Sequence, residues 1–246
     1  LEKRNRLMND EEKNIVAHHE VGHALVACLV PGADPVRKVS MIPRGAAALG
    51  YTMQMPTEDR YVLRRNELMD RMAVMLGGRS AEEVVFGEIS TGAQNDLQKA
   101  TELAREMVIE FGMCEELGPL SYSRRSNSQG GPSEFFGGSR WSERTARKID
   151  DAVRQIIDDA HTKALELLRG HKDALMAVAV ALKEQEVIEQ DQLAEMLAEH
   201  DIELPETTRR HEGEEAAEEQ SAGDGPTTDE PDEEQPTTAP EDAPAG

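Results

Sequence analysis

Apolar residues recur every three or four positions through most of the first 200 residues, which is the spacing of helices with one buried face. The clearest case is 142–170, where charged residues separate the apolar ones and Ser142 can cap the start. The same pattern predicts helices over about 10–30, 58–76, 81–86, 97–112, 171–185 and 190–199, with Gly77-Gly78 interrupting the helical run between 58 and 86.

Two short segments, 36–42 and 49–55, have β character instead. Residues at alternate positions of the second segment are large and apolar, and Pro43-Arg44-Gly45 provides a turn between the two segments. They predict a β-hairpin or small sheet. The expected fold is therefore mainly α, with this small sheet close to the first helix.

Charge divides the chain into a folded part and a tail. Of the net charge of −22, residues 206–246 carry 14 acidic and only 2 basic residues, and they include no aromatic or β-branched aliphatic side chain. Such a segment cannot bury enough apolar surface to offset its chain entropy. We predict a linker over 1–8, one folded domain over 9–204, and a disordered, acidic, Pro-rich tail over 205–246.

Composition also excludes some classes of function. An acidic chain without a basic stripe does not suit nucleic acid, which needs clustered Lys and Arg. No run of 18 apolar residues is present, so we expect no transmembrane helix and a soluble polypeptide. Because the sequence begins with Leu1 in a charged segment, we expect a fragment of a longer protein.

The candidate chemistry lies in the first helix, at His19-Glu20-Val21-Gly22-His23. Residues four apart lie on one face of a helix, so His19 and His23 can direct two imidazoles at one point. Two imidazoles and an open position suit Zn²⁺, and Glu20 beside them suits a general base. The alternative is a structural accident. The apolar flanks argue against an accident, because they imply that the motif is buried. Burying its polar side chains without partners would cost on the order of several kcal/mol.

A catalytic zinc site needs a third protein ligand, and the residue pattern alone leaves its identity open. Three histidines on the C-terminal helices lie among surface charges, which favours solvated or cap positions for them. Two carboxylates lie on the short helix after Gly77-Gly78, and a third starts a helix after a glycine-containing turn. The candidates are His161, His171, His200, Glu82, Glu83 and Asp96.

Ordered motifs along about residues 5–200 resemble the peptidase domain of the FtsH family, the membrane-anchored, ATP-dependent zinc endopeptidases of the AAA type. The blocks are HHEVGHALVA, KVSMIPRG, LGYTM, MLGGRSAEEVVFG, STGAQNDLQKAT, GMCEELGPLSY and SERTARKIDDAV. The resemblance implies that His19 and His23 are zinc ligands, that Glu20 is the general base, and that Asp96 is the third ligand. It implies that Glu82 is an acidic residue near the metal that orients a ligand.

The resemblance further implies that the strand around Leu49, Gly50, Tyr51, Thr52 and Met53 is an edge to which an extended substrate adds by main-chain pairing. Two positions of the first motif depart from the usual family pattern, which has an aromatic residue at the position of His18 and alanine at that of Val21. His18 points about 100° away from His19 on the helix, so we do not expect it to bind metal with His23.

The expected function is therefore cleavage of peptide bonds in unfolded, damaged or membrane proteins, by a zinc-activated water with one Zn²⁺ per chain. The resemblance implies a hexameric ring and a parent protein in the inner or cell membrane, with this domain on the cytoplasmic side. The membrane anchor and the ATPase domain would lie outside this sequence, which contains no phosphate-binding G-x-x-x-x-G-K-[ST] motif. The alternative is a non-catalytic helical module for ring assembly that holds a structural zinc.

Overall fold

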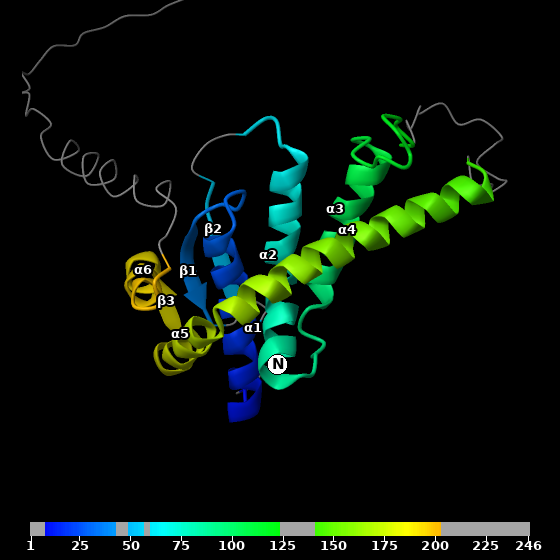
Figure 1. Cartoon of the computed structure of the whole chain (residues 1–246). Helices are drawn as coiled ribbons and strands as arrows, with labels where there is room; N and C mark the ends of the chain where they lie inside the picture. The colour runs from blue at the N-terminus through cyan, green and yellow to red at the C-terminus, as the bar shows by residue number, and fades with distance from the viewer. Residues whose placement is uncertain (1–7, 43–48, 57–59, 124–140, 203–246) are drawn as a thin grey trace, which may run out of the picture. The chain divides into compact units, whose positions relative to one another are not determined.

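The computed structural model describes residues 8–42, 49–56, 60–123 and 141–202, and these ranges are mainly helical with one small sheet (Figure 1). The predicted fold class is confirmed. In chain order the elements are α1 (Asp10–Leu29), β1 (Val36–Ser40), β2 (Tyr51–Gln54), α2 (Arg65–Phe86), α3 (Gln94–Ile109), α4 (Glu143–Gly170), α5 (Lys172–Gln185), β3 (Val187–Glu189) and α6 (Gln190–Ala198).

Local sequence fixes the start of α1 and of α4, and the cap of α4 is the predicted Ser142. Asn9 and Glu12 form a reciprocal capping box at α1: Glu12 N donates to Asn9 Oδ1 at 2.7 Å, and Asn9 N donates to Glu12 Oε2 at 3.1 Å. At α4, Ser142 Oγ accepts from Thr145 N at 3.2 Å. These caps satisfy amide groups that have no partner inside a helix.

Helix α2 differs from the prediction in two ways. It begins at Arg65, so Tyr61 and Val62 precede it and are 92% and 83% exposed, and it runs without a break through Gly77-Gly78. The glycines allow α1 and α2 to touch: a Cβ on Gly22 would lie 2.5 Å from Gly77 O. Glycine inside a helix costs roughly 0.5–1 kcal/mol relative to alanine, and here the close helix contact offsets that cost.

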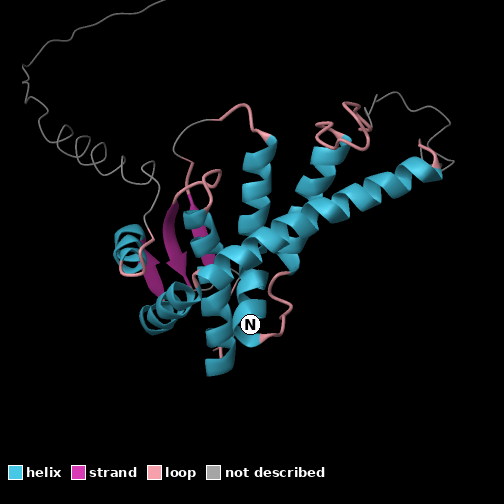
Figure 2. Cartoon of the chain, viewed as in Figure 1, coloured by secondary structure: helices cyan, strands magenta, loops and turns pink. Residues whose placement is uncertain are grey.

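The three strands form an antiparallel sheet in the order β2-β1-β3 (Figure 2). Val39 in β1 pairs with Thr52 on one side and with Ile188 on the other. The predicted β1–β2 pairing is present, and the turn expected at 43–45 lies outside the described residues. The sequence analysis missed β3, because three residues between two helices leave too short a pattern.

Helix α1 is mostly buried from Val16 onward and packs into one of two apolar clusters. One cluster joins α1 to the sheet, α5 and α6, and the other joins α2, α3 and α4. Figure 1 shows α4 crossing α2 and α3. No helix in the described ranges is long and apolar enough to cross a bilayer. Most of the predicted linker 1–8 and all of the predicted tail 205–246 lie outside these ranges, so both remain predictions.

Candidate metal centre

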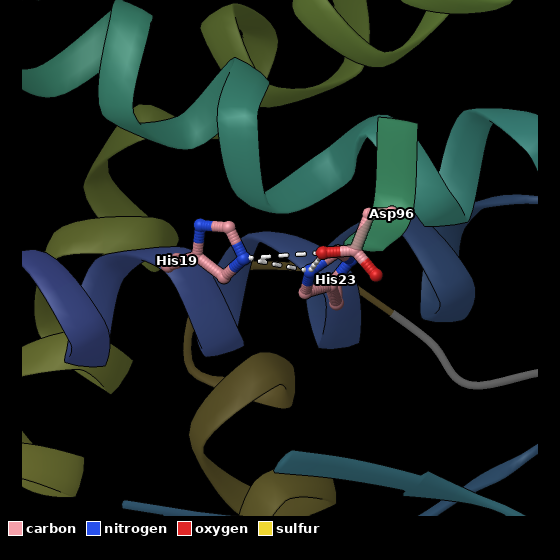
Figure 3. Close-up of side chains that lie close together, drawn as sticks. All are labelled: His19, His23 and Asp96. Carbon is pink, nitrogen blue, oxygen red and sulfur yellow. Dashed lines mark hydrogen bonds and ion pairs between the residues drawn. The ribbon is translucent and has the colours of Figure 1, made fainter. Parts of the chain in front are cut away.

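Two histidines from the middle of α1 and one aspartate from the first turn of α3 come together (Figure 3). His19 Nε2 and His23 Nε2 are 3.1 Å apart, and each lies 3.5 Å from Asp96 Oδ2. All the candidate ligand atoms lie within 4.8 Å of one another, and this is the one such group among the described residues. The two histidine side chains are 10% and 12% exposed and that of Asp96 is 22% exposed, so few waters compete for the two nitrogen atoms.

Hydrogen bonds on the far side of each ring determine which nitrogen faces the centre. His19 Nδ1 lies 2.7 Å from Glu82 Oε1, and His23 Nδ1 lies 2.7 Å from Val74 O. A carboxylate and a carbonyl only accept, so both Nδ1 atoms carry the proton. In the neutral rings both Nε2 lone pairs then point at the centre, which is the tautomer that metal-binding histidines use.

Gly78 keeps the space beside the two Nε2 atoms free. A Cβ on this residue would lie 2.5 Å from Nε2 of His19 and 2.5 Å from Nε2 of His23. Zinc bonds imidazole nitrogen at about 2.0–2.1 Å and carboxylate oxygen at about 2.0–2.2 Å. Two imidazoles, one carboxylate and the room left by a missing side chain therefore fit a Zn²⁺ ion with a position left for water.

Glu20 lies on α1 directly after His19 and is 8% exposed. Thr52 Oγ1 is 3.0 Å from Glu20 Oε2 and 2.9 Å from Glu20 O, and Gly50 lies so close that a Cβ there would be 2.8 Å from Glu20 Cγ. Burial raises the pKa of Glu20, while the two neighbouring histidines and the Thr52 hydroxyl lower it, and the balance is a raised pKa. A carboxylate of raised pKa is suited to accept a proton near neutral pH.

The metal-free centre holds the carboxylate of Asp96 charged. Burial opposes this, but hydrogen bonds from His19 and His23 hold the pKa of Asp96 far below its usual range. Burial alone would lower the pKa of His19. Hydrogen bonds to Asp96 and Glu82 outweigh burial and raise it to about 9. A proton on His19 thus occupies the place where a cation would bind, and metal binding would release it.

The other candidates from the sequence lie elsewhere. His161 faces Glu83, with Nε2 3.5 Å from Glu83 Oε2, and His171 lies at the junction of α4 and α5. Neither they nor His200 join the group around Asp96. His18 faces away from the centre, as its place on the helix predicts, and packs edge-on against Phe86 with ring centroids 5.2 Å apart.

The predicted substrate edge lies beside Glu20. β2 is an outer strand of the sheet, next to β1 only among the described strands. Leu49 is half exposed, Gly50 is buried, and Tyr51, Thr52 and Met53 are partly buried. Within the strand, Thr52 contacts Glu20 through its hydroxyl group. The alternation of residues along a strand does not predict this contact.

The role of Gly78 does not follow from the local sequence. The pair Gly77-Gly78 predicts a helix break, although glycine inside a helical pattern also marks close packing. The apolar residues before the pair and the Ala81–Phe86 run after it continue one helix, and that continuity was the available signal.

Known proteins are similar to this chain over most of its length. Residues 6–196 match the model of Peptidase family M41. An "ATP-dependent zinc metalloprotease FtsH" of Syntrophobacter fumaroxidans is 54% identical over 202 residues, covering 81% of this chain and 31% of that protein. Proteins of the same name from Burkholderia pseudomallei and Thermotoga maritima are 46% and 44% identical, covering 92% and 80% of this chain and 34% and 32% of the relatives.

The chain spans about a third of the length of these relatives. The family match nevertheless covers most of the chain and includes all the residues of the centre. The chain therefore belongs to peptidase family M41.

Proposed function

We propose that the chain is a zinc endopeptidase domain that hydrolyses peptide bonds of unfolded, damaged or membrane polypeptides. One observation carries the proposal: His19, His23 and Asp96 converge from two helices, with the buried carboxylate of Glu20 beside them. Membership of a peptidase family and the names of the relatives support the same chemistry.

His19 and His23 would hold the zinc through Nε2, and Asp96 would hold it through a carboxylate oxygen. When bound, zinc supplies a Lewis acid that makes water more acidic and polarises a carbonyl group. Three protein ligands leave a fourth position open, as catalytic zinc sites require. Glu82 fixes His19 in the required tautomer and raises its basicity as a ligand.

Glu20 acts as the general base. Because Thr52 lies against Oε2, Oε1 is the atom that takes the proton from the attacking water. The protonated carboxyl then gives that proton to the amine that leaves when the peptide bond breaks. Burial supports this role, since it brings the pKa of Glu20 up toward the working pH.

An extended substrate binds along β2. The strand lies at the outer side of the sheet and reaches Glu20 through Thr52 and Gly50. Main-chain pairing with such a strand gives affinity with little dependence on sequence, which suits a protease of unfolded chains.

The relatives' longer sequences suggest the setting of the domain. Their names describe ATP-dependent proteases, and this chain spans only about a third of them. We infer that residues 9–204 form the peptidase domain between a linker at 1–8 and an acidic tail at 205–246. In the longer protein an ATPase domain would deliver substrate, a membrane anchor would place the domain at the cytoplasmic side of the membrane, and six copies would form a ring.

The rival function is a non-catalytic helical module for ring assembly with a structural zinc. Structural zinc sites are closed by four protein ligands, whereas three candidate ligands gather among the described residues. A structural site also has no use for a buried carboxylate placed like Glu20. Both observations favour the enzyme.

Metal analysis joined to a cleavage assay tests the proposal. The purified chain should hold one zinc, cleave an unfolded casein-type substrate, lose cleavage when zinc is chelated, and regain it when zinc is restored. Asp96→Asn should lower the zinc content and the cleavage together. A chain that assembles but neither binds zinc nor cleaves would contradict the enzyme and favour the assembly module.

A further inference from the structure

The buried carboxylate of Glu82 has two partners besides His19, and both belong to Ser90. Glu82 is 1% exposed, so water cannot satisfy its oxygens. Ser90 N donates to Glu82 Oε2 at 2.6 Å, and Ser90 Oγ donates to Glu82 Oε1 at 3.0 Å. Oε1 is the same oxygen that accepts from His19 Nδ1 at 2.7 Å. The carboxylate is therefore held from one side by Ser90 and from the other by the proposed zinc ligand.

The Ser90 hydroxyl also ties down the turn that leads to the other ligand. Ser90 Oγ accepts from Gly92 N at 3.1 Å, and four residues after Gly92, Asp96 lies in the first turn of α3. One hydroxyl thus connects the carboxylate that orients His19 with the turn that carries Asp96. These two ligands come from different helices, and this bridge links the group that orients one to the turn that carries the other.

We propose that Ser90 is a positioning residue of the metal centre, which fixes the orientation of His19 through Glu82 and the place of Asp96 through the turn at Gly92. The inference rests on the proposed zinc site. Loss of the hydroxyl would leave Glu82 Oε1 with a single donor in a place that water does not reach, so the carboxylate would rotate and take the imidazole with it. It would also free the turn that places the carboxylate of Asp96.

A purely structural role for Ser90 is the competing explanation, because a hydroxyl in a turn commonly stabilises the turn alone. The two explanations differ in what they change. A turn stabiliser alters the free energy of unfolding and leaves metal affinity alone. A positioning residue alters metal affinity in a chain that still folds, and its effect requires Glu82.

The test compares Ser90→Ala, Ser90→Thr and a matched control, Ser80→Ala. Ser80 is buried, and its hydroxyl bonds Leu76 O within its own helix α2 at 2.8 Å. Zn²⁺ affinity is measured by competition with a chromophoric chelator, and ligand geometry by the visible absorption of Co²⁺ bound in place of zinc. Circular dichroism and unfolding in urea establish that each variant folds.

We expect Ser90→Ala to weaken Zn²⁺ binding about tenfold, the lower end of the effect of changing residues behind metal ligands, and to alter the Co²⁺ spectrum. Ser90→Thr keeps both the hydroxyl and the N–H, and Ser90 is only partly buried, so parent affinity should return. In a Glu82→Gln background, Ser90→Ala should add less than it does alone, because it acts through that carboxylate.

Each result decides between the explanations. If Ser90→Ala folds and binds Zn²⁺ as tightly as Ser80→Ala does, with an unchanged Co²⁺ spectrum, the inference is wrong. If the losses from Ser90→Ala and Glu82→Gln simply add, Ser90 does not act through Glu82 and the inference is also wrong. If the parent chain itself binds neither metal, the proposed function fails, which is a separate outcome seen in the parent alone.

Discussion

A single methyl group on Gly78 should disable the metal centre without disturbing the fold. The Cβ of Gly78→Ala would lie 2.5 Å from Nε2 of both His19 and His23, whereas ordinary contacts begin at 3.4 Å, so each ring must move by about 0.9 Å. Each ring is held by a Nδ1 hydrogen bond of 2.7 Å, which a displacement of that size would stretch beyond about 3.2 Å, the usual limit.

Losing a hydrogen bond to a buried acceptor costs about 1–3 kcal/mol, and 1.4 kcal/mol is a factor of ten in a dissociation constant. Two such bonds are at stake, one on each ring, and the loss of one alone is expected to weaken Zn²⁺ binding by roughly 5- to 150-fold in Gly78→Ala. The helix itself should tolerate the change, because alanine is favoured over glycine inside a helix by about 0.5–1 kcal/mol.

The assay is Zn²⁺ competition with a chelator, with helix content followed by circular dichroism. Gly170→Ala is the matched control, because a Cβ at the end of α4 meets no atom within 4 Å. Gly170→Ala should bind Zn²⁺ like the parent. Equal zinc affinity in Gly78→Ala and Gly170→Ala would refute the assignment of this space to the metal.

Gly22→Ala should lower the free energy of unfolding in urea by about 1–3 kcal/mol, because its Cβ would lie 2.5 Å from a backbone carbonyl oxygen of α2. A variant as stable as the parent would contradict the close contact between α1 and α2. Thr52→Val removes a hydrogen bond that lowers the pKa of Glu20, so the acid limb of kcat/KM should move to higher pH while Thr52→Ser leaves it in place. With zinc removed by a chelator, the pKa of His19 is raised from 6.5 to about 9. The contribution of protonated His19 to the free energy of unfolding should therefore be full below pH 6.5 and be lost as the pH rises through 9. A free energy of unfolding in urea that stays the same between about pH 6 and pH 10 would contradict this.

The parts of the molecule that follow from local spacing could be predicted from sequence. The i, i+4 spacing of His19 and His23 places both on one face of α1, and the structure has their Nε2 atoms 3.1 Å apart. The cap at Ser142 and the long amphipathic pattern after it likewise give α4 with its observed start. In such cases the information lies within one or two helical turns.

The parts that depend on contacts distant in sequence could not be derived in this way. Residue spacing alone left the third member of the centre open, and only the family resemblance singled out Asp96. The bonds of Glu82 to His19 and Ser90 depend on how α1, α2 and the following turn pack. The continuity of α2 through Gly78 also depends on a distant contact, because glycine is needed there to leave room for His19 and His23 of α1. Tertiary contact there outweighs local propensity.

The most direct test of the central claim is to measure zinc content and peptide cleavage together in the parent chain and in Glu20→Gln. The substitution keeps the size of the side chain and removes the base, and none of the three proposed ligands changes. The account predicts one zinc per chain in both proteins, with cleavage of an unfolded casein-type substrate by the parent alone. Cleavage by Glu20→Gln at the parent rate, with zinc bound, would contradict it.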